Sequence, residues 1–414
     1  MIQFRHIFLP ALACVPVLAG AQDFNSLAKE VSQSSPAVAA DSVSASAAAE
    51  RLRAENRPEG TELEFEHLWN SQGGHNRWSL SVSQQFLWPG AYSTAGELEG
   101  ATDRMLRNQS LAYRMQAAAD AEALLIDLAA GLKTLEIQQA ISDNLDSLMN
   151  HYEKSFKAGE ATILEVNKLR VERARARAAV SQTIEANTAT RDMLQAMSPD
   201  ATLPSDAILK RLFSSPLPGI ADVEDDIMTA SALAREAEVE QAKAAERHGR
   251  RASLPSISLG YAHAYEDATH FNGLSIGIGL PSYGTSASNR ASAAEALATR
   301  MKAITARAEE NARRRSLISR VKALTYALDE LEPAVDGVTA GQLAGGKAST
   351  LSSSDGTNVQ QQLLLKALKG GQISVIEYLN ESNFLMEAMV ECVSLRGEIL
   401  RSIALLRPLT VPAE

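Results

Sequence analysis

Apolar residues between Pro89 and Pro199 recur every three or four positions, which is the spacing of one helix face. This stretch has no internal proline and is rich in Ala, Leu, Glu, Arg and Gln, which are good helix formers. Its apolar seam resembles that of a coiled coil and consists of Leu125, Leu128, Leu132, Leu135, Ile141, Leu145, Leu148 and Tyr152. A helix of about 60 residues would be roughly 90 Å long. The pattern therefore predicts unusually long helices over residues 91–197.

Two short stretches each predict the end of one helix and the start of the next. They read "FKAGEATILEVNK" (156–168) and "LKGGQISVIEYLN" (368–380). Gly159 and Gly371 can take the left-handed conformation that ends a helix, and three residues later "TILE" and "SVIE" match the capping box of a helix start. Because the spacing is the same in both stretches, we expect two equivalent turns and an internal two-fold repeat.

Four other segments alternate apolar and polar residues with the period of a β-strand. They are "TELEFEHLW" (61–69), "WSLSVSQQFLW" (78–88), "LPSISLGYAHAY" (254–265) and "GLSIGIGL" (273–280). "NSQGGHNR" and "EDATHFN" connect them into hairpins over 61–88 and 254–281. Strands of about 9–11 residues can span a membrane. All three tryptophans lie near strand ends, as in the aromatic girdles of membrane barrels.

These hairpins allow two interpretations. They could pack on helices in a soluble protein, or they could face lipid with their apolar side. The second interpretation is favoured, because the opposite side carries almost only small or polar residues, as a water-filled lumen requires. Lipid tolerates no open sheet edge, and four strands are too few to close a barrel. We therefore expect several chains to share one barrel.

The rest of the chain suggests how the two repeats are organised. Arg5 and His6 precede the apolar run "IFLPALACVPVLAG", and Ala19-Gly20-Ala21 fits a cleavage site before Gln22. Cys14 lies inside this run, and the alternative of a lipidated N-terminus is disfavoured because the apolar stretch before it is very short. No other segment has 18 consecutive apolar residues. Prolines mark a linker, and "GQLAGGKASTLSSSDGT" reads as a loop. The expected units are a signal peptide (1–21), a first repeat (22–200), a linker (201–222) and a second repeat (223–414) with long helices over 285–407.

Composition and charge argue against several classes of function. The formal net charge of −10 argues against a nucleic-acid-binding protein. Two cysteines provide neither a disulfide framework nor a metal-binding CxxC pair. The seven histidines include no helical H-x-x-x-H pair, and His67 and His263 read as membrane-interface residues rather than metal ligands. The basic runs "RARAR" (173–177) and "ARRRS" (312–316) read as solvated helix faces. We expect no enzyme activity, no cofactor and no metal site.

Together these features resemble the TolC family of outer-membrane efflux channels. The resemblance rests on the signal peptide, the two-fold repeat, "SSPAVAA" near the mature N-terminus, the two hairpins and the paired glycine turns. It covers essentially the whole mature chain. "LEFEHLW" followed by "NRWSLSVSQQFLWPGAY" is similar to members found beside heavy-metal or cation efflux pumps.

The resemblance implies a mainly α fold with a small β part. In such a homotrimer each chain gives four strands to a shared 12-stranded β-barrel in the outer membrane, and long antiparallel helical hairpins form an α-barrel across the periplasm. The duct is passive and catalyses nothing. Its partners are a periplasmic adaptor protein and an inner-membrane pump of the resistance-nodulation-division or ABC type, in an efflux or type I secretion system. Most of the chain then lies in the periplasm.

The same resemblance assigns candidate sites. The paired turns form the periplasmic tip where the adaptor docks: Lys157, Ala158, Gly159, Glu160, Lys369, Gly370, Gly371 and Gln372. Glu165 and Glu377 match positions that often carry an aspartate at the constriction, and six carboxylates per trimer would form a negative gate ring. A capping role for both glutamates remains the alternative. The candidate aromatic girdle consists of Trp69, Trp78, Trp88, Tyr261 and Tyr265.

Two other functions compete with a channel. A periplasmic adaptor also uses long helical hairpins, but it would surround one hairpin with β-rich domains, whereas this chain has two similar halves. A soluble coiled-coil scaffold would not explain tryptophans at the ends of alternating strands. Either rival predicts that the strands never meet lipid.

Overall fold

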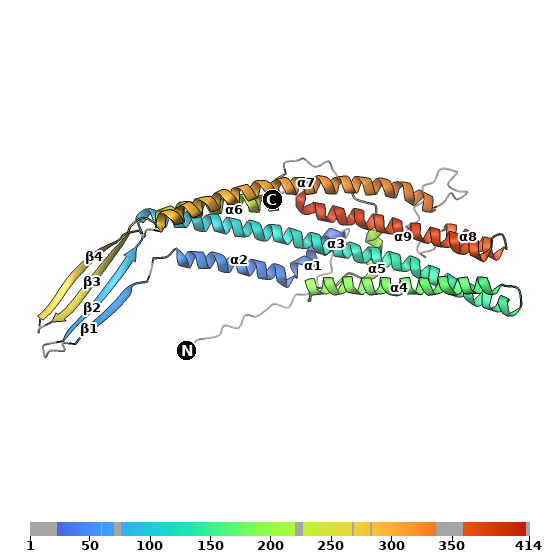
Figure 1. Ribbon diagram of the computed structural model, residues 1–414, viewed down its shortest axis with the longest axis horizontal. Coiled ribbons are helices and arrows are strands. Elements are labelled where there is room, and N and C mark those ends of the chain that lie inside the picture. The colour runs from blue at the N-terminus through green and yellow to red at the C-terminus, as the bar shows by residue number, and fades with distance from the viewer. Residues whose placement is uncertain are drawn as a thin grey trace, which may run out of the picture.

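Long helices and one small sheet lie at different ends of the molecule in a computed structural model (Figure 1). The structure describes residues 23–58, 60–69, 76–219, 227–266, 269–281, 284–336 and 359–410. The predicted signal peptide and the predicted loop over 341–357 lie outside these residues.

The longest helix, α3, spans Pro89–Lys157 and has 69 residues. Proline suits its first turn because the missing N–H would have no partner there. Helix α4 (Ile163–Met197) returns antiparallel to α3 after a short turn. The second half contains α6 (Ala230–Ala252), α7 (Thr285–Asp336), α8 (Val359–Lys369) and α9 (Val375–Leu406). The predicted long helices are confirmed. Among the described residues, none of these helices combines the length and apolarity needed to cross a membrane.

The expected apolar seam of α3 forms the main core. Six of its eight residues are buried: Leu125, Leu128, Leu132, Ile141, Leu145 and Leu148. Leu135 is only half-buried, whereas Ile137, which was not part of the predicted seam, is buried. Residues from α4, α9 and the N-terminal helix α1 (Phe24–Gln33) pack against this seam. Helix α2 (Pro36–Glu55) continues from α1 towards the sheet (Figure 1).

The stretch predicted as a linker is part of the core. It contains α5 (Asp206–Phe213), whose Leu209 and Phe213 have no exposed surface. Buried Arg396 of α9 donates from Nε to the Phe213 carbonyl oxygen at 2.7 Å. The prolines at 204 and 216 lie on either side of this helix.

Four antiparallel strands form one sheet in the order β1-β2-β3-β4. Their bounds are β1 Glu62–Leu68, β2 Arg77–Phe86, β3 Ser256–Glu266 and β4 Thr269–Gly279. The second hairpin differs from the prediction, because Thr269 to Asn272 continue the ladder of β4 instead of forming a connection. The alternation of apolar and polar residues over 269–272 is weak, since Phe271 is apolar on the otherwise polar side. The start of the strand could therefore not be predicted from the sequence.

The register places the apolar positions of all four strands on one face. Leu63 pairs with Val82, Val82 with Tyr261 and Tyr261 with Leu274. Residues directly opposite each other in a ladder share a face, so a shift by one residue would have mixed the two faces. On β4 the apolar side chains of this face are largely exposed, with Leu274 86% and Ile276 76% exposed. Nothing in the described part of this chain covers it.

A close helix crossing was not predicted from the sequence. Gly131 of α3 lies against Asn187 of α4, and a Cβ at position 131 would overlap the Asn187 Oδ1 atom. Asn187 is 4% exposed. The glycine therefore lets a buried polar side chain sit between the two helices.

Candidate functional site

Two turns of the same geometry join α3 to α4 and α8 to α9. Gly159 has φ 80° and Gly371 has φ 68°, both in the left-handed region that favours glycine. In each turn the residue after the glycine donates its N–H to a carbonyl five residues back, from Glu160 to Ser155 at 2.8 Å and from Gln372 to Ala367 at 2.9 Å. This is the Schellman pattern that closes a helix end. The prediction of two equivalent turns is confirmed in the backbone.

The predicted capping boxes are also present. Glu165 Oε2 accepts the Thr162 N–H at 2.7 Å, and the Glu165 N–H reaches Thr162 Oγ1 at 3.3 Å. Glu377 Oε2 accepts the Ser374 N–H at 2.8 Å, and the Glu377 N–H reaches Ser374 Oγ at 3.2 Å. Both glutamates thus fix the start of a helix.

The cap also affects the ionisation of Glu377. Ser374 lowers the pKa of this carboxyl, chiefly through its backbone N–H and then through its hydroxyl. A lowered pKa means that the cap contributes stability above the ordinary pKa of a glutamate. That contribution is lost as the pH falls through the lowered value.

Both turns lie at the same end of the molecule, opposite the sheet (Figure 1). No atom lies within 4 Å of where a Cβ would stand on Gly159 or Gly371, so both backbones are open to close approach. Lys157 and Lys369 are the last residues of their helices, where a cation suits the negative end of the dipole. Ala158 and Gly370 follow them at equivalent places. The predicted tip residues are therefore grouped together in space.

Helices α4 and α9 contact each other just beyond the turns. Lys168 Nζ donates to Asn380 Oδ1 at 3.2 Å, and Asn383 Nδ2 donates to Glu172 Oε2 at 3.2 Å. Lys168 and Asn380 occupy the last position of the two repeated stretches. These bonds link the two helical hairpins of one chain near their tip.

The predicted aromatic residues lie on or beside the apolar face of the sheet. Trp78 and Tyr265 are cross-strand partners near the loop end, and their ring centroids are 6.2 Å apart. Trp69 follows β1 at the same end, while Trp88 precedes α3 at the helix end. Tyr261 differs from the expectation, because its pairing with Val82 and Leu274 puts it in the middle of the sheet. It does not mark a strand end.

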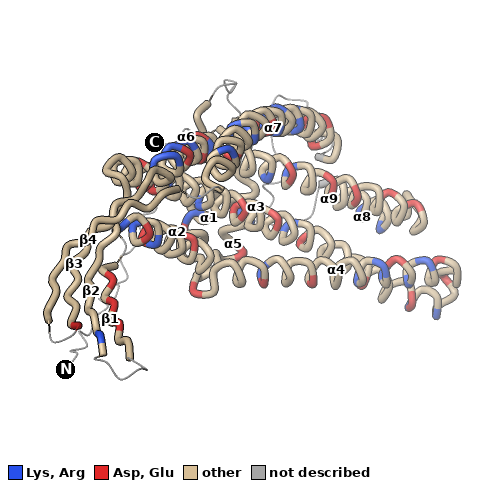
Figure 2. Tube along the Cα trace, turned by 60° about the vertical axis from the view of Figure 1, so that its left-hand side comes forward, with Lys and Arg blue, Asp and Glu red and all other residues tan. Residues whose placement is uncertain are grey.

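The other face of the sheet is small and polar. Glu62, Glu64 and Glu66 line it along β1, and Glu66 Oε2 accepts from Ser79 Oγ at 3.3 Å. Figure 2 shows this acidic edge beside strands β3 and β4 that carry almost no charge. Arg77 pairs with Glu266 at 3.6 Å near the loop end of the same face.

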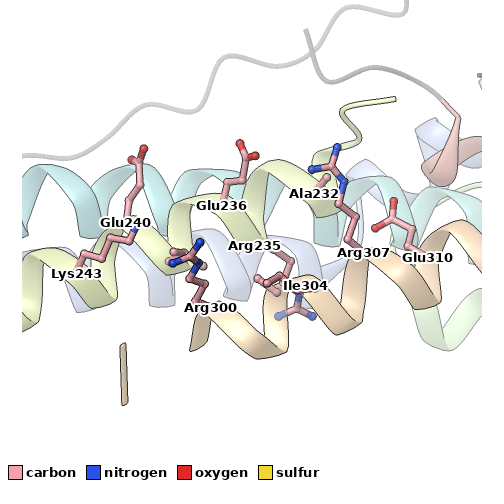
Figure 3. A pocket seen from close by; sticks show the side chains of 11 residues that line it. Ala232, Arg235, Glu236, Glu240, Lys243, Arg300, Ile304, Arg307 and Glu310 are labelled. Atoms are coloured by element: carbon pink, nitrogen blue, oxygen red, sulfur yellow. The ribbon is translucent and has the colours of Figure 1, made fainter. Parts of the chain in front are cut away.

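One groove lies between α6 and α7, and charges of both signs line it (Figure 3). Glu310 Oε1 accepts from Thr229 Oγ1 at 2.6 Å, and Glu240 pairs with Arg104 at 3.4 Å. The lining contains no histidine, cysteine, serine or threonine. The groove therefore presents no hydroxyl, thiol or imidazole group from its lining residues.

The basic run over 312–316 differs from its prediction as a solvated face. Arg314 is 1% exposed, and its guanidinium donates to the Leu409 carbonyl at 3.4 Å and to Asn311 Oδ1 at 2.8 Å. It anchors the 3-10 helix η3 (Arg407–Leu409) that follows α9. In the first run, Arg177 pairs with Asp146 of α3 at 2.8 Å. No periodicity distinguishes a buried arginine from its solvated neighbours, so the sequence could not reveal this role.

Comparison with known proteins identifies the fold. No family model matches the chain, and no curated protein matches its sequence. Solved structures do match over nearly the whole chain. A crystal structure of CusC, from a study of folding and transmembrane channel formation, has a TM-score of 0.71 at 14% identity and covers 94% of this chain and 92% of its own.

Two further solved structures have a similar fold. The outer membrane protein VceC of Vibrio cholerae has a TM-score of 0.69 at 14% identity, covering 94% of this chain and 97% of its own. The CmeC outer membrane channel of Campylobacter jejuni has a TM-score of 0.72 at 10% identity, covering 94% of this chain and 85% of its own. These proteins are described as channels or outer-membrane proteins rather than enzymes. The chain therefore has the fold of the TolC family of outer-membrane channels.

Proposed function

We propose that the protein is a passive exit duct of the outer membrane, serving a tripartite efflux or type I secretion system. Three copies would share one barrel of twelve strands, and their long helices would enclose a tunnel through the periplasm. Each chain then consists of two repeats, joined by the segment around α5. Cargo would pass from an inner-membrane pump through a periplasmic adaptor to the exterior.

One observation carries this proposal: the sheet has an exposed apolar face and two free edges. Within the described residues, β1 and β4 each pair on one side only. In water such a sheet would aggregate, and in lipid its unpaired backbone groups would each cost several kcal/mol. Pairing β4 of one copy with β1 of the next removes both problems.

The helices support the same assembly. Helix α4 leaves Leu164, Val171 and Ala178 exposed at intervals of seven residues. Helix α7 leaves Leu297, Met301 and Ile304 exposed at spacings of four and three. Such stripes fit the packing seam of a neighbouring helix. A second copy of the chain would cover them.

The mass of the detergent-extracted protein tests the proposal. We expect a trimer from the outer-membrane fraction that dissociates to monomer on heating, and ion conductance after reconstitution into planar bilayers. A soluble periplasmic monomer would contradict the proposal. It would favour the rival adaptor or scaffold.

The turn glycines give a prediction about the adaptor. Gly371→Val should weaken adaptor binding, because a β-branched residue resists positive φ and its side chain fills the open space beside the turn. The measurement is crosslinking yield with the cognate adaptor in cells. Gly273→Val is a useful comparison, since it changes a glycine in open space on the sheet, far from the tip. Equal crosslinking of wild type and Gly371→Val would remove the turn from the docking site.

The two capping glutamates give a prediction about ion selectivity. Glutamine also serves at this capping position, so Glu165→Gln with Glu377→Gln keeps the cap and removes only the charge. If the carboxylates form a ring in the trimer, the double variant should be less cation-selective in single-channel recordings. Glu160→Gln provides a control at the tip outside the ring. Unchanged selectivity in the double variant would leave the glutamates with the capping role alone.

A further inference from the structure

Two histidines meet on neighbouring strands near the loop end of the sheet. His263 lies on β3 and His270 on β4, and the ladder makes them diagonal neighbours on the apolar face. His263 Nε2 and His270 Nδ1 are 3.3 Å apart. One ion bound by two nitrogens at about 2.0–2.1 Å each, with an angle near 90–110°, holds them about 2.9–3.4 Å apart. The observed separation falls inside this range.

A third side chain fixes the protonation of the pair. Asn272 Oδ1 accepts from His263 Nδ1 at 2.7 Å and from the Tyr261 hydroxyl at 2.7 Å. An amide oxygen only accepts, so Nδ1 of His263 carries a proton, and in the neutral ring Nε2 is then the nitrogen with the lone pair. A metal-binding histidine is normally held in this way by an acceptor behind the ring. The asparagine thus presents the nitrogen that faces His270 as a ligand.

We propose that His263 and His270 form a binding site for a divalent late transition-metal ion, with Cu²⁺ bound most tightly. Imidazole nitrogens suit Cu²⁺, Ni²⁺ and Zn²⁺, and affinity within this group peaks at Cu²⁺. On binding, the ion replaces the proton that His270 Nδ1 donates to His263 Nε2. That proton moves to His270 Nε2, so the ring changes tautomer and releases no proton.

The surroundings set the strength and the coordination of the site. The rings lie 27° from parallel with centroids 5.3 Å apart, so the exposed His270 ring has to rotate before both lone pairs can point at one ion. Glu266 lies on the opposite face and pairs with Arg77. No group of three or more metal-binding side chains occurs in the described part of the chain. Because the pair lies at the loop end of the sheet, water at the membrane surface can complete the coordination, and we expect a weak site that joins β3 to β4.

The test uses the full-length mature protein in detergent, purified without a histidine tag. Titration with Cu²⁺ should show one site per chain, and its paramagnetic resonance spectrum should show coupling to two imidazole nitrogens. His263→Gln and His270→Gln should each lower the affinity by at least 10-fold, and the double variant should lose little more than either single one. Asn272→Ala should weaken binding roughly 10-fold, the usual effect of removing the group behind a ligand.

His151→Gln is the control, since His151 lies near the end of α3, at the opposite end of the molecule from the sheet. It should bind Cu²⁺ as the wild type does, and circular dichroism should show that all variants are folded. Wild-type affinity in folded His263→Gln would overturn the proposal. So would losses from the two single variants that simply add, because they would indicate two independent single-histidine sites. Neither the titration nor these controls require a trimer, so the result is independent of the proposed duct.

Discussion

Val82→Arg should abolish the heat-dissociable outer-membrane trimer that we propose. Val82 lies on the apolar face of the central strand β2, in the row of Leu63, Tyr261 and Leu274 near the middle of the sheet. If that face meets lipid, an arginine at this depth costs about 2–4 kcal/mol per chain. The measurement is the amount of trimer in outer-membrane fractions, seen on gels of unheated samples.

The neighbouring residue supplies the control. Ser81 points to the other face, where its hydroxyl lies 3.5 Å from Glu64 Oε2. Ser81→Arg adds the same charge to the same strand, but on the face that we assign to water and beside a carboxylate. It should assemble normally. Equal loss of trimer in both variants would indicate a general defect of the strand, and equal retention would show that the apolar face does not meet lipid.

Gly131→Ala should destabilise the helical part of the protein. The added Cβ would overlap Asn187 Oδ1, so α3 and α4 would have to separate or Asn187 would have to move. Overpacking of this kind costs about 1–3 kcal/mol. The measurement is the temperature of helix loss by circular dichroism, compared at one heating rate.

Two variants separate this clash from other effects of the substitution. Gly96 lies in the same helix with nothing within 4 Å of its missing Cβ. Gly96→Ala should raise the stability by up to about 1 kcal/mol, because alanine is the better helix former. Adding Asn187→Ala to Gly131→Ala removes the overlapping atom and should restore most of the loss. If Gly131→Ala proved as stable as Gly96→Ala, the close crossing of α3 and α4 would be refuted.

Features within one element could be predicted from sequence because each is encoded locally. The seam from Leu125 to Leu148 has the helix period, and the alternation around Val82 and Tyr261 has the strand period, so burial and face follow from position. The turn at Gly159 likewise follows from the glycine and the capping box after it. The candidate periplasmic tip could therefore be predicted from two local sequence patterns. Strand ends were less clear, as at Thr269, because one apolar residue on the wrong face interrupts the alternation.

The long helices, the two glycine turns and the sidedness of the strands could be predicted from the residues alone, because these features depend on residue type and spacing over a few turns or pairs. The three-dimensional packing was needed to show that Arg314 is buried, that α5 belongs to the core, that Gly131 makes room for Asn187, and that His263 lies beside His270. Each of these is a contact between elements, and it depends on how helices cross or which strands pair in register. Such contacts produce no periodic pattern in the sequence, because a buried arginine or a paired histidine has the same local spacing as a solvated one.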